Sequence, residues 1–242
     1  MRRTTRAGLF WAAALVFAAG YVVACLELPP LGSAFHPYAG LAVPAALEQR
    51  TANAVASVTF DLRGFDTLGE ESVLFAAVLG AVLLLRRTRD EQESRPRPGR
   101  LQPTVRLTGT VLLPVALVTG VYVVAHGQLT PGGGFQGGVV LATGLHVAYL
   151  AADYRVLEQV RPRDVLDVTE AVAAGAFAVL GFAGLVEAAA YLENVLPLGT
   201  LGQLTSGGLV PLLNVAVGLE VGSALVVLLA GFIDQALEIE SE

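Results

Sequence analysis

Long apolar segments with few or no charges alternate with polar ones along the chain, and each apolar segment is near the length that a helix needs to cross a bilayer of about 30 Å. Backbone groups in lipid must be satisfied within the segment, and no segment shows the alternating pattern of an outer-membrane barrel. The pattern therefore predicts an all-α, polytopic membrane protein with about six transmembrane helices: Gly8–Leu26, Glu70–Leu85, Leu107–Ala125, Gly137–Ala152, Val168–Glu187 and Leu209–Phe232.

The segment RRTRDEQESRPRPGR, Arg86–Arg100, interrupts the apolar pattern. Its charge and its prolines are typical of a linker. It divides the predicted helices into two and four. We therefore predict a two-helix region at 1–88, a cytoplasmic linker at 89–104 and a four-helix region at 105–242.

The arginines are distributed unevenly among the connecting segments. All fifteen cationic residues are arginine, and thirteen fall on one side of the membrane if both termini are cytoplasmic. Only Arg50 and Arg63 fall on the other side. Positive charge is enriched in cytoplasmic loops, so the sequence predicts two cytoplasmic termini in a multi-pass protein of the cell membrane.

Composition narrows the class of protein. Only 15% of residues are charged, compared with about 25% in soluble domains, and the mean hydropathy is +0.64. The net charge of −6 gives no basic surface for nucleic acid. With one cysteine and three isolated histidines, no metal-ligand spacing occurs. We expect no metal, no cofactor and no catalytic site, because no nucleophile–base constellation or Walker motif is present.

The N-terminus has two interpretations. Three arginines, an apolar run and the sequence VVAC are typical of a lipoprotein signal that is lipidated at Cys25. The apolar run is about 18 residues long and exceeds the usual apolar region of a signal, which favours an uncleaved anchor helix.

Glu220 lies near the middle of the last predicted helix. An ionisable group there costs about 2.5–3.5 kcal/mol on insertion scales, so Glu220 is a candidate for the ion path, as a buried proton carrier or as a protonated structural residue. Gly218 and Gly222 share a face suited to close helix packing. Glu220 lies about 200° away and is expected to face another neighbour.

Two predicted helices carry polar residues at helical spacing. They are Thr143, His146 and Tyr149 on the fourth helix, and Thr119, Tyr122 and His126 on the third. Hydrogen bonding between helices is the interpretation we favour. Proton relay through His146 is the alternative.

The connection between the third and fourth predicted helices is rich in glycine. Its proline is expected to stop one helix, and the glycines that follow permit positive φ. Glycines four residues apart let the next helix begin against a neighbour's backbone, and the phenylalanine is expected to plug the turn into an adjacent helix. The residues expected to serve packing and assembly are Pro131, Gly132, Gly133, Gly134, Phe135, Gly137 and Gly138.

Two regions resemble parts of one membrane machine. TPGGGFQGGVV (130–140) and SGGLVPLLNVAVGLEV (206–221) lie in a region, about 101–234, that resembles the B subunit of Mrp-type multisubunit sodium/proton antiporters. TANAVASVTFDLRGFDTLGEESVLFAAVLG (51–80) resembles the C-terminal end of their A subunit, which corresponds to the E-type component of membrane-bound hydrogenases. The chain is therefore similar to a fusion of these two pieces.

The resemblance implies a non-autonomous subunit that contributes to assembly and to the ion path. It implies partner subunits of the A, C, D, E, F and G types, and exchange of Na⁺, or another monovalent cation, for protons. An Asp, an Arg and a Glu in the A-subunit motif are linked to ion passage. They match Asp61, Arg63 and Glu70, with Asp66 in register.

These matched residues lie in DLRGFDTLGEE (61–71), directly before an uncharged run. We expect Asp61 to pair with Arg63 at the outer face, and Glu70 to begin the second helix, where the helix dipole favours an anion. Carboxylate oxygens also suit a hard cation such as Na⁺. The stretch is thus a predicted gate, and Glu70→Ala is expected to abolish antiport in an assembled complex.

Two other functions fit the sequence. The same module would serve as a membrane subunit of an energy-converting hydrogenase or a complex-I-like oxidoreductase. A purely structural scaffold, whose carboxylates never meet an ion, is the second alternative.

Overall fold

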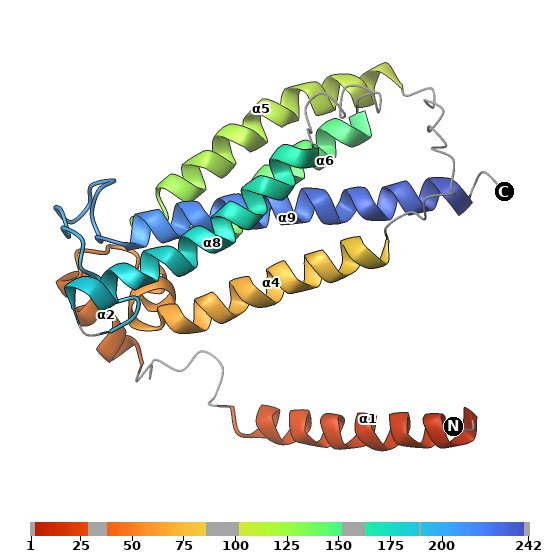
Figure 1. Cartoon of the computed structure of the whole chain (residues 1–242), viewed down its shortest axis with the longest axis horizontal. Coiled ribbons are helices and arrows are strands. Elements are labelled where there is room, and N and C mark those ends of the chain that lie inside the picture. Colours follow the sequence, from red (N-terminus) through yellow and green to blue (C-terminus); the bar gives the residue numbers. More distant parts are fainter. Residues whose placement is uncertain (1–2, 29–37, 86–101, 152–162, 189, 240–242) are drawn as a thin grey trace. The chain divides into compact units, whose positions relative to one another are not determined.

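The computed structural model describes residues 3–28, 38–85, 102–151, 163–188 and 190–239 of the chain (Figure 1). Every regular element among these residues is a helix, which confirms the predicted all-α class. The linker Arg86–Arg100 lies outside the described residues. The predicted three-region division and the orientation of the termini stay predictions.

Five described helices are long and apolar enough to cross a membrane, and they confirm the prediction of a multi-pass membrane protein. Their spanning parts are Ala7–Leu26, Gly64–Leu84, Pro103–Ala125, Val165–Glu187 and Val210–Phe232. The fourth predicted span corresponds to helix α6 (Gly134–Ala151), which at 18 residues is shorter than each of these five. The described residues therefore hold five candidate spans and two further apolar helices, α6 and the shorter Ala39–Glu48, against the six spans predicted.

The chain forms two compact units, Met1–Gly40 and Leu41–Glu242. The first unit contains α1 (Arg3–Leu26), whose spanning part has no buried side chain. Cys25 lies in the last turn of α1 and is exposed. Both interpretations of the N-terminus stay predictions.

The second unit is a bundle in which α9 (Val210–Ile239) is the central helix. Its other elements are α2 (Ala39–Glu48) from Leu41 onward, α3 (Ala54–Ser57), the π-helix η1 (Val58–Leu62), α4 (Gly64–Leu84), α5 (Pro103–Ala125), α6 and α8 (Arg163–Glu187). Helix α9 packs against α4, α5, α6, α8 and η1. Helices α4 and α9 begin, and α8 ends, at the end of the bundle where α2 lies (Figure 1), which we call the α2 end.

The glycine-rich turn between α5 and α6 lies at the α2 end. Helix α5 ends at Ala125, several residues before Pro131, so the prediction that Pro131 stops this helix is wrong. The cap residue His126 already leaves the helical conformation. Gly132 and Gly133 have φ values of +130° and +131°, a region that residues with a side chain rarely adopt, and the chain reverses through them.

Helix α6 begins in direct contact with α9. The Gly134 N–H, which has no partner within its own helix, donates to Oδ1 of Asn214 on α9 at 2.8 Å. A Cβ atom added at Gly138 would lie 2.9 Å from the Gly218 carbonyl oxygen and 3.0 Å from the Gly222 nitrogen. The two backbones therefore meet at these glycines.

Two further residues of the turn face the bundle. A Cβ atom at Gly137 would lie 2.9 Å from the carbonyl oxygen of Gly120 on α5, so this glycine brings α6 close to α5. Phe135 is partly buried against the apolar core around Phe177 and Leu213, where it joins the turn to the bundle.

Candidate functional site

Asp61 lies in the π-helix η1 at the α2 end. Its Oδ2 atom is buried and has no hydrogen-bond partner among the described residues. Burial raises the pKa of Asp61, and a hydrogen bond with the Asn194 side chain lowers it in part. Asn194 is held by the Gly207 carbonyl, to which it donates at 3.0 Å, and by the Leu209 N–H, from which it accepts at 2.8 Å. Asp61 thus faces an ordered loop, not Arg63.

Arg63 forms an ion pair with Asp66, three residues further along the chain. The predicted Asp61–Arg63 pair is wrong, because Asp61 faces Asn194 while Asp66 lies in the first turn of α4. The Arg63 and Asp66 side chains are 62% and 53% exposed. An ion pair this exposed is worth about 0–1 kcal/mol.

Helix α4 begins at Gly64, so the predicted start at Glu70 is wrong. Helix η1 leads into α4 with only Arg63 between them. The favourable position near the helix dipole is therefore held by Asp66. Glu70 lies in the second turn of α4 and is exposed.

Glu71, one residue after Glu70, faces the interior. It belongs to the buried face of α4 together with Gly64, Thr67 and Val78, whose spacing follows the helical period. Its side chain is only 2% exposed. Successive helical residues are rotated by about 100°, which is why the neighbouring Glu70 faces outward.

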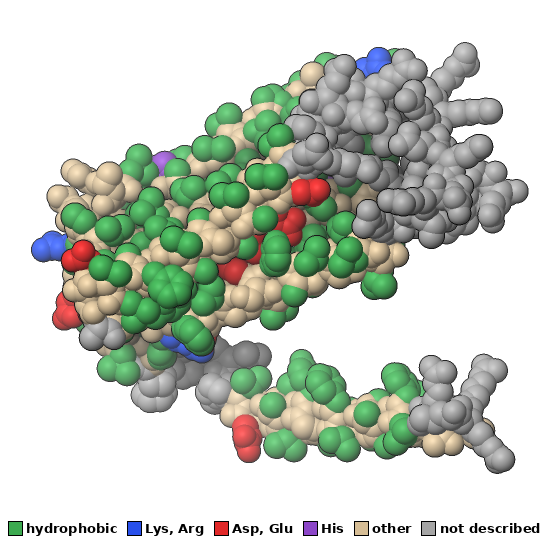
Figure 2. All heavy atoms as spheres, viewed as in Figure 1, with side chains coloured by type: hydrophobic (Ala, Val, Ile, Leu, Met, Phe, Trp, Pro, Cys, Tyr) green, Lys and Arg blue, Asp and Glu red, His purple; other side chains and the backbone are tan. Residues whose placement is uncertain are grey.

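The Glu71 carboxyl group lies within hydrogen-bonding reach of the Glu220 carboxyl group on α9. Glu220 is 0% exposed, and none of the four oxygens of the two carboxyl groups has a hydrogen-bond donor among the described residues. Glu170 on α8 is 6% exposed and is close enough to feel the Glu220 charge. We call Glu71, Glu170 and Glu220 the carboxyl cluster. Figure 2 shows acidic side chains in the seam between α8 and α4.

The surroundings of the carboxyl cluster are apolar. Along α9, Val217 and Val221 belong to one apolar core, and Ala224 belongs to a second core that includes Val78 of α4. The charged groups that act on the cluster from α4 and α8 are also acidic, namely Glu70 and Asp167. No three metal-ligating side chains come together at metal-binding distance in the part of the chain that the structure describes.

The glycines beside Glu220 face the other side of α9. A Cβ atom at Gly218 would approach Val124 of α5 at 2.7 Å, and Gly222 lies next to Gly138 of α6. The α9 helix therefore directs its small residues toward α5 and α6 and its carboxyl group toward α4.

Three residues of the predicted polar stripes, Thr143, Tyr122 and His126, make contacts with neighbours on the same helix or at its end. The Thr143 hydroxyl donates to the Val139 carbonyl at 2.8 Å, and the rings of Tyr122 and His126 stack at 4.0 Å. His146 is half-buried on α6, a helix that packs against α5 and α9. Its role in a proton relay stays a prediction.

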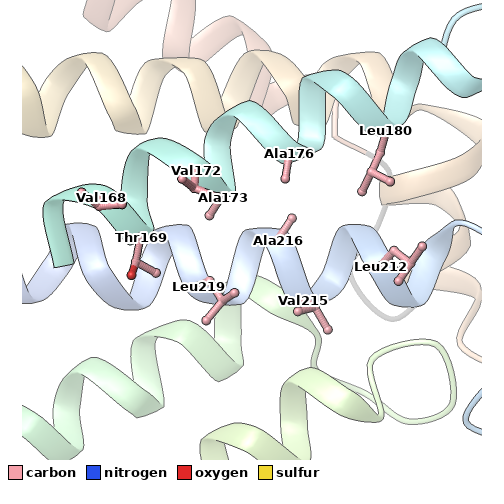
Figure 3. Close-up of a pocket in the computed structure, with 10 residues that line it drawn as sticks. All are labelled: Val168, Thr169, Val172, Ala173, Ala176, Leu180, Leu212, Val215, Ala216 and Leu219. Carbon is pink, nitrogen blue, oxygen red and sulfur yellow. The ribbon is translucent and has the colours of Figure 1, made fainter. Parts of the chain in front are cut away.

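An apolar groove of about 350 Å³ lies between α8 and α9 (Figure 3). Its lining residues are Val168, Thr169, Val172, Ala173, Ala176, Leu180, Leu212, Val215, Ala216 and Leu219. With only the Thr169 hydroxyl as a polar lining group, the groove offers an ion no ligand set, and the carboxyl cluster is the candidate site.

Glu71 and Glu170 were not among the site residues predicted from the sequence. Gly64, Thr67 and Glu71 follow the i, i+3, i+7 spacing of one helix face. This pattern is visible in the sequence only if the helix is taken to begin at Gly64. Glu170 shares a face with Ala173 and Phe177, both buried, and it lies inside the predicted fifth span. An acidic residue within a predicted span was the available signal.

Known proteins match the chain in two parts. The family model for a domain related to the MnhB subunit of Na⁺/H⁺ antiporters matches residues 104–227, and the model for MbhE, the E-type component of MBH, matches residues 13–102. An uncharacterised protein of Methanocaldococcus jannaschii is 27% identical over an alignment that covers 72% of this chain and 74% of that protein.

Two solved complexes contain chains with the same fold. A chain of the membrane-bound sulfane sulfur reductase, an archaeal respiratory membrane complex, matches with a TM-score of 0.71 and 28% identity over 93% of this chain and 97% of that one. A chain of the Mrp complex from Dietzia sp. matches with a TM-score of 0.69 and 22% identity, over 96% of this chain and 26% of that one. Together with the family match over half of its length, these likenesses show that the chain is a multi-pass membrane subunit that belongs to the family of domains related to the MnhB subunit of Na⁺/H⁺ antiporters.

Proposed function

We propose that the chain is a non-autonomous subunit of an Mrp-type antiporter that exchanges Na⁺, or another monovalent cation, for protons. It contributes to assembly of the complex and to the ion path, and it has no catalytic site of its own. The family match at residues 104–227 and the shared fold with a chain of an Mrp complex support this proposal.

The carboxyl cluster is the observation that carries the proposal. Three helices each contribute one glutamate residue that is at most 6% exposed inside this chain alone. Burying an unpaired charge is costly, and acidic groups inside membrane spans typically mark ion or proton pathways. A scaffold would be more stable with apolar residues at these positions.

The cluster is assembled from both matched parts of the chain. Glu71 lies in the part matched by the MbhE model, and Glu170 and Glu220 lie in the part matched by the MnhB-related domain. Four residues that are more exposed than the cluster would then form the approach to this site from the α2 end. They are Asp61, Arg63, Asp66 and Glu70.

The outer surface of the bundle supports partners within a membrane. Large apolar side chains are exposed along several helices, among them Leu107, Val118 and Phe182. Apolar surface of this extent is covered by lipid or by other membrane proteins. Subunits of the A, C, D, E, F and G types are the proposed partners, and Na⁺ and H⁺ are the proposed transported ions.

One observation favours a second candidate function. The chain of the sulfane sulfur reductase complex is matched over 97% of its length at 28% identity, so one chain of a respiratory complex has the same extent as this chain. A membrane subunit of such an oxidoreductase is therefore the alternative. Redox subunits that co-purify with this chain would favour it, and antiporter subunits alone would favour the first proposal.

The test is Glu71→Gln in the assembled complex, because glutamine keeps the shape of the side chain and removes its ionisable group. We expect loss of Na⁺-driven ΔpH in membrane vesicles, with the complex intact on a native gel. Glu48→Gln on α2, an exposed position, is the matched control and should transport normally. Wild-type transport by Glu71→Gln would refute a role for the cluster in the ion path.

A further inference from the structure

We propose that the Glu71–Glu220 pair is a proton-binding site that does not take a metal cation, and that Glu170 is the group through which its proton exchanges. This inference rests on the proposed function, since it names the ion that one part of the path carries. Three observations support it: the absence of donors at the pair among the described residues, the short list of oxygen ligands around it, and the order of the carboxyl groups along the bundle.

Among the described residues, the pair has no hydrogen-bond donor. Its two carboxyl groups face each other, and all four oxygens are buried without a donor among the described residues. Two adjacent carboxylates in an apolar interior repel each other, and a shared proton removes this repulsion. A proton on one oxygen also supplies the O–H that the other carboxylate accepts. One proton thus satisfies both groups.

The charged neighbours of the pair in the described part of the chain give it no other compensation. On α4 the neighbour is Glu70, and on α8 it is Glu170, whose own charged neighbour is Asp167; all three are acidic. Helix α6, on another side of α9, carries the half-buried His146. No cationic side chain among the described residues acts on the pair, so we infer that its positive charge comes from a bound ion, the smallest of which is a proton.

A metal cation would lack ligands at this position. Hard cations in proteins take about six or more oxygen ligands. Glu71 and Glu220 supply two carboxyl groups, and no third acidic or imidazole side chain joins them at metal-binding distance in the described part of the chain. Ser223, one turn along α9, adds at most one hydroxyl. Helical carbonyl groups are occupied within their helices, so the ligand set is incomplete.

The cluster members lie at increasing depth from the α2 end. Asp61 precedes α4, and at 1.5 Å per residue Glu71 lies about 10 Å along α4 and Glu220 about 15 Å along α9. Glu170 lies about 25 Å from the end of α8 at the α2 end. The carboxyl groups thus form a row along the bundle, with the pair between Asp61 and Glu170.

Exchange of a proton between the pair and Glu170 conserves bonds and charge. An O–H bond on the pair breaks as an O–H bond forms on the Glu170 carboxylate, and one negative charge moves from Glu170 to the pair. No oxidant, reductant or metal takes part. The reverse step restores the proton on the pair.

The test is infrared difference spectroscopy of the purified complex at neutral pH. We expect a C=O band of a buried protonated carboxylic acid that shifts in D₂O, changes in frequency or intensity in both Glu71→Gln and Glu220→Gln, and is unchanged in the Glu48→Gln control. Adding NaCl in place of choline chloride should leave the band unchanged. Because this comparison of NaCl with choline chloride uses the wild-type complex, the proposal can be tested even if a variant fails to assemble.

Two results would overturn parts of this inference. Loss of the band on addition of Na⁺ would show that the pair takes the cation, which refutes the proton assignment and leaves the proposed transport function standing. In Glu170→Gln we expect the band to exchange H for D more slowly than in the wild-type complex. An unchanged rate of H/D exchange would refute the role of Glu170 in proton exchange. Normal transport by Glu71→Gln, in contrast, refutes the proposed function itself.

Discussion

Replacing Gly138 by alanine is expected to weaken the contact between α6 and α9. The added Cβ atom would lie 2.8 Å from Cβ of Val221, 2.9 Å from the carbonyl oxygen of Gly218 and 3.0 Å from the nitrogen of Gly222. Two of these three atoms belong to the backbone of the central helix. They cannot move by a change of rotamer, so the helices must separate.

The magnitude follows from two opposing effects. Overpacking of a close contact typically costs about 1–3 kcal/mol. Alanine is a better helix former than glycine by about 1 kcal/mol, which offsets part of this cost. Gly175→Ala on α8 is the matched control, because it has the same gain in helix propensity and a Cβ atom there would meet nothing within 4 Å. The difference between the two variants isolates the overpacking cost of about 1–3 kcal/mol.

The assay is thermal unfolding of the full chain in detergent, followed by far-UV circular dichroism, together with assembly on a native gel. For a chain of this size, 1 kcal/mol corresponds to a change in Tm of about 2–4 °C. Gly138→Ala should therefore melt about 2–12 °C below Gly175→Ala. Equal melting temperatures would refute the argument that close backbone contact at this glycine holds α6 on α9.

Three further predictions concern the α2 end. Asn53→Asp loses the amide that donates to the carbonyl oxygens of Gly127 at 2.8 Å and Thr130 at 2.9 Å. The free energy of unfolding should therefore fall by about 1–3 kcal/mol, measured by thermal melts, and a wild-type Tm would contradict this. Burial raises the pKa of Asp61 in the folded protein above its usual value. The folded state therefore favours the neutral carboxyl group, and this contribution to stability is fully present below the pKa of the unfolded chain, about 3.9. The contribution is lost as pH rises through the pKa of the folded protein. Asp61→Asn should therefore match the wild-type Tm near pH 4 and exceed it at pH 7, and a constant difference would exclude this linkage. Arg63→Gln should lower the free energy of unfolding by at most about 1 kcal/mol, and only at low salt, because its ion pair is exposed. A larger loss that does not depend on salt would indicate a buried contact instead.

Hydropathy predicted the existence of the long helices and not all of their ends. The predicted span Leu107–Ala125 ends where α5 ends, because the apolar run and the helix stop together there. Helix α4 begins six residues before the predicted Glu70, because its first turns carry Asp66 and Glu70 and continue past the apolar run. A hydropathy pattern records where lipid contact ends, whereas a helix continues as long as its backbone hydrogen bonds do.

The carboxyl cluster could not be derived from the same pattern. In a membrane helix both the lipid-facing and the buried sides are apolar, so hydrophobic periodicity does not identify the buried face. The phase of α4 decides between Glu70 and Glu71, and a shift of one residue changes the direction of the side chain by about 100°. The family resemblance placed the functional carboxylate at Glu70, and the structure turns its neighbour Glu71 toward Glu220.

The way the cluster is assembled connects ion handling to assembly. Glu71 comes from the part of the chain that matches the MbhE model, and its two partners come from the part that matches the MnhB-related domain. Without α4, Glu220 would lose the carboxyl group it faces and would meet lipid or water instead. Because one chain carries both parts, they are held at a high effective concentration and in a fixed ratio of one to one. The buried pair therefore exists only when the two parts are docked, so an incompletely folded chain lacks the site that we assign to the proton.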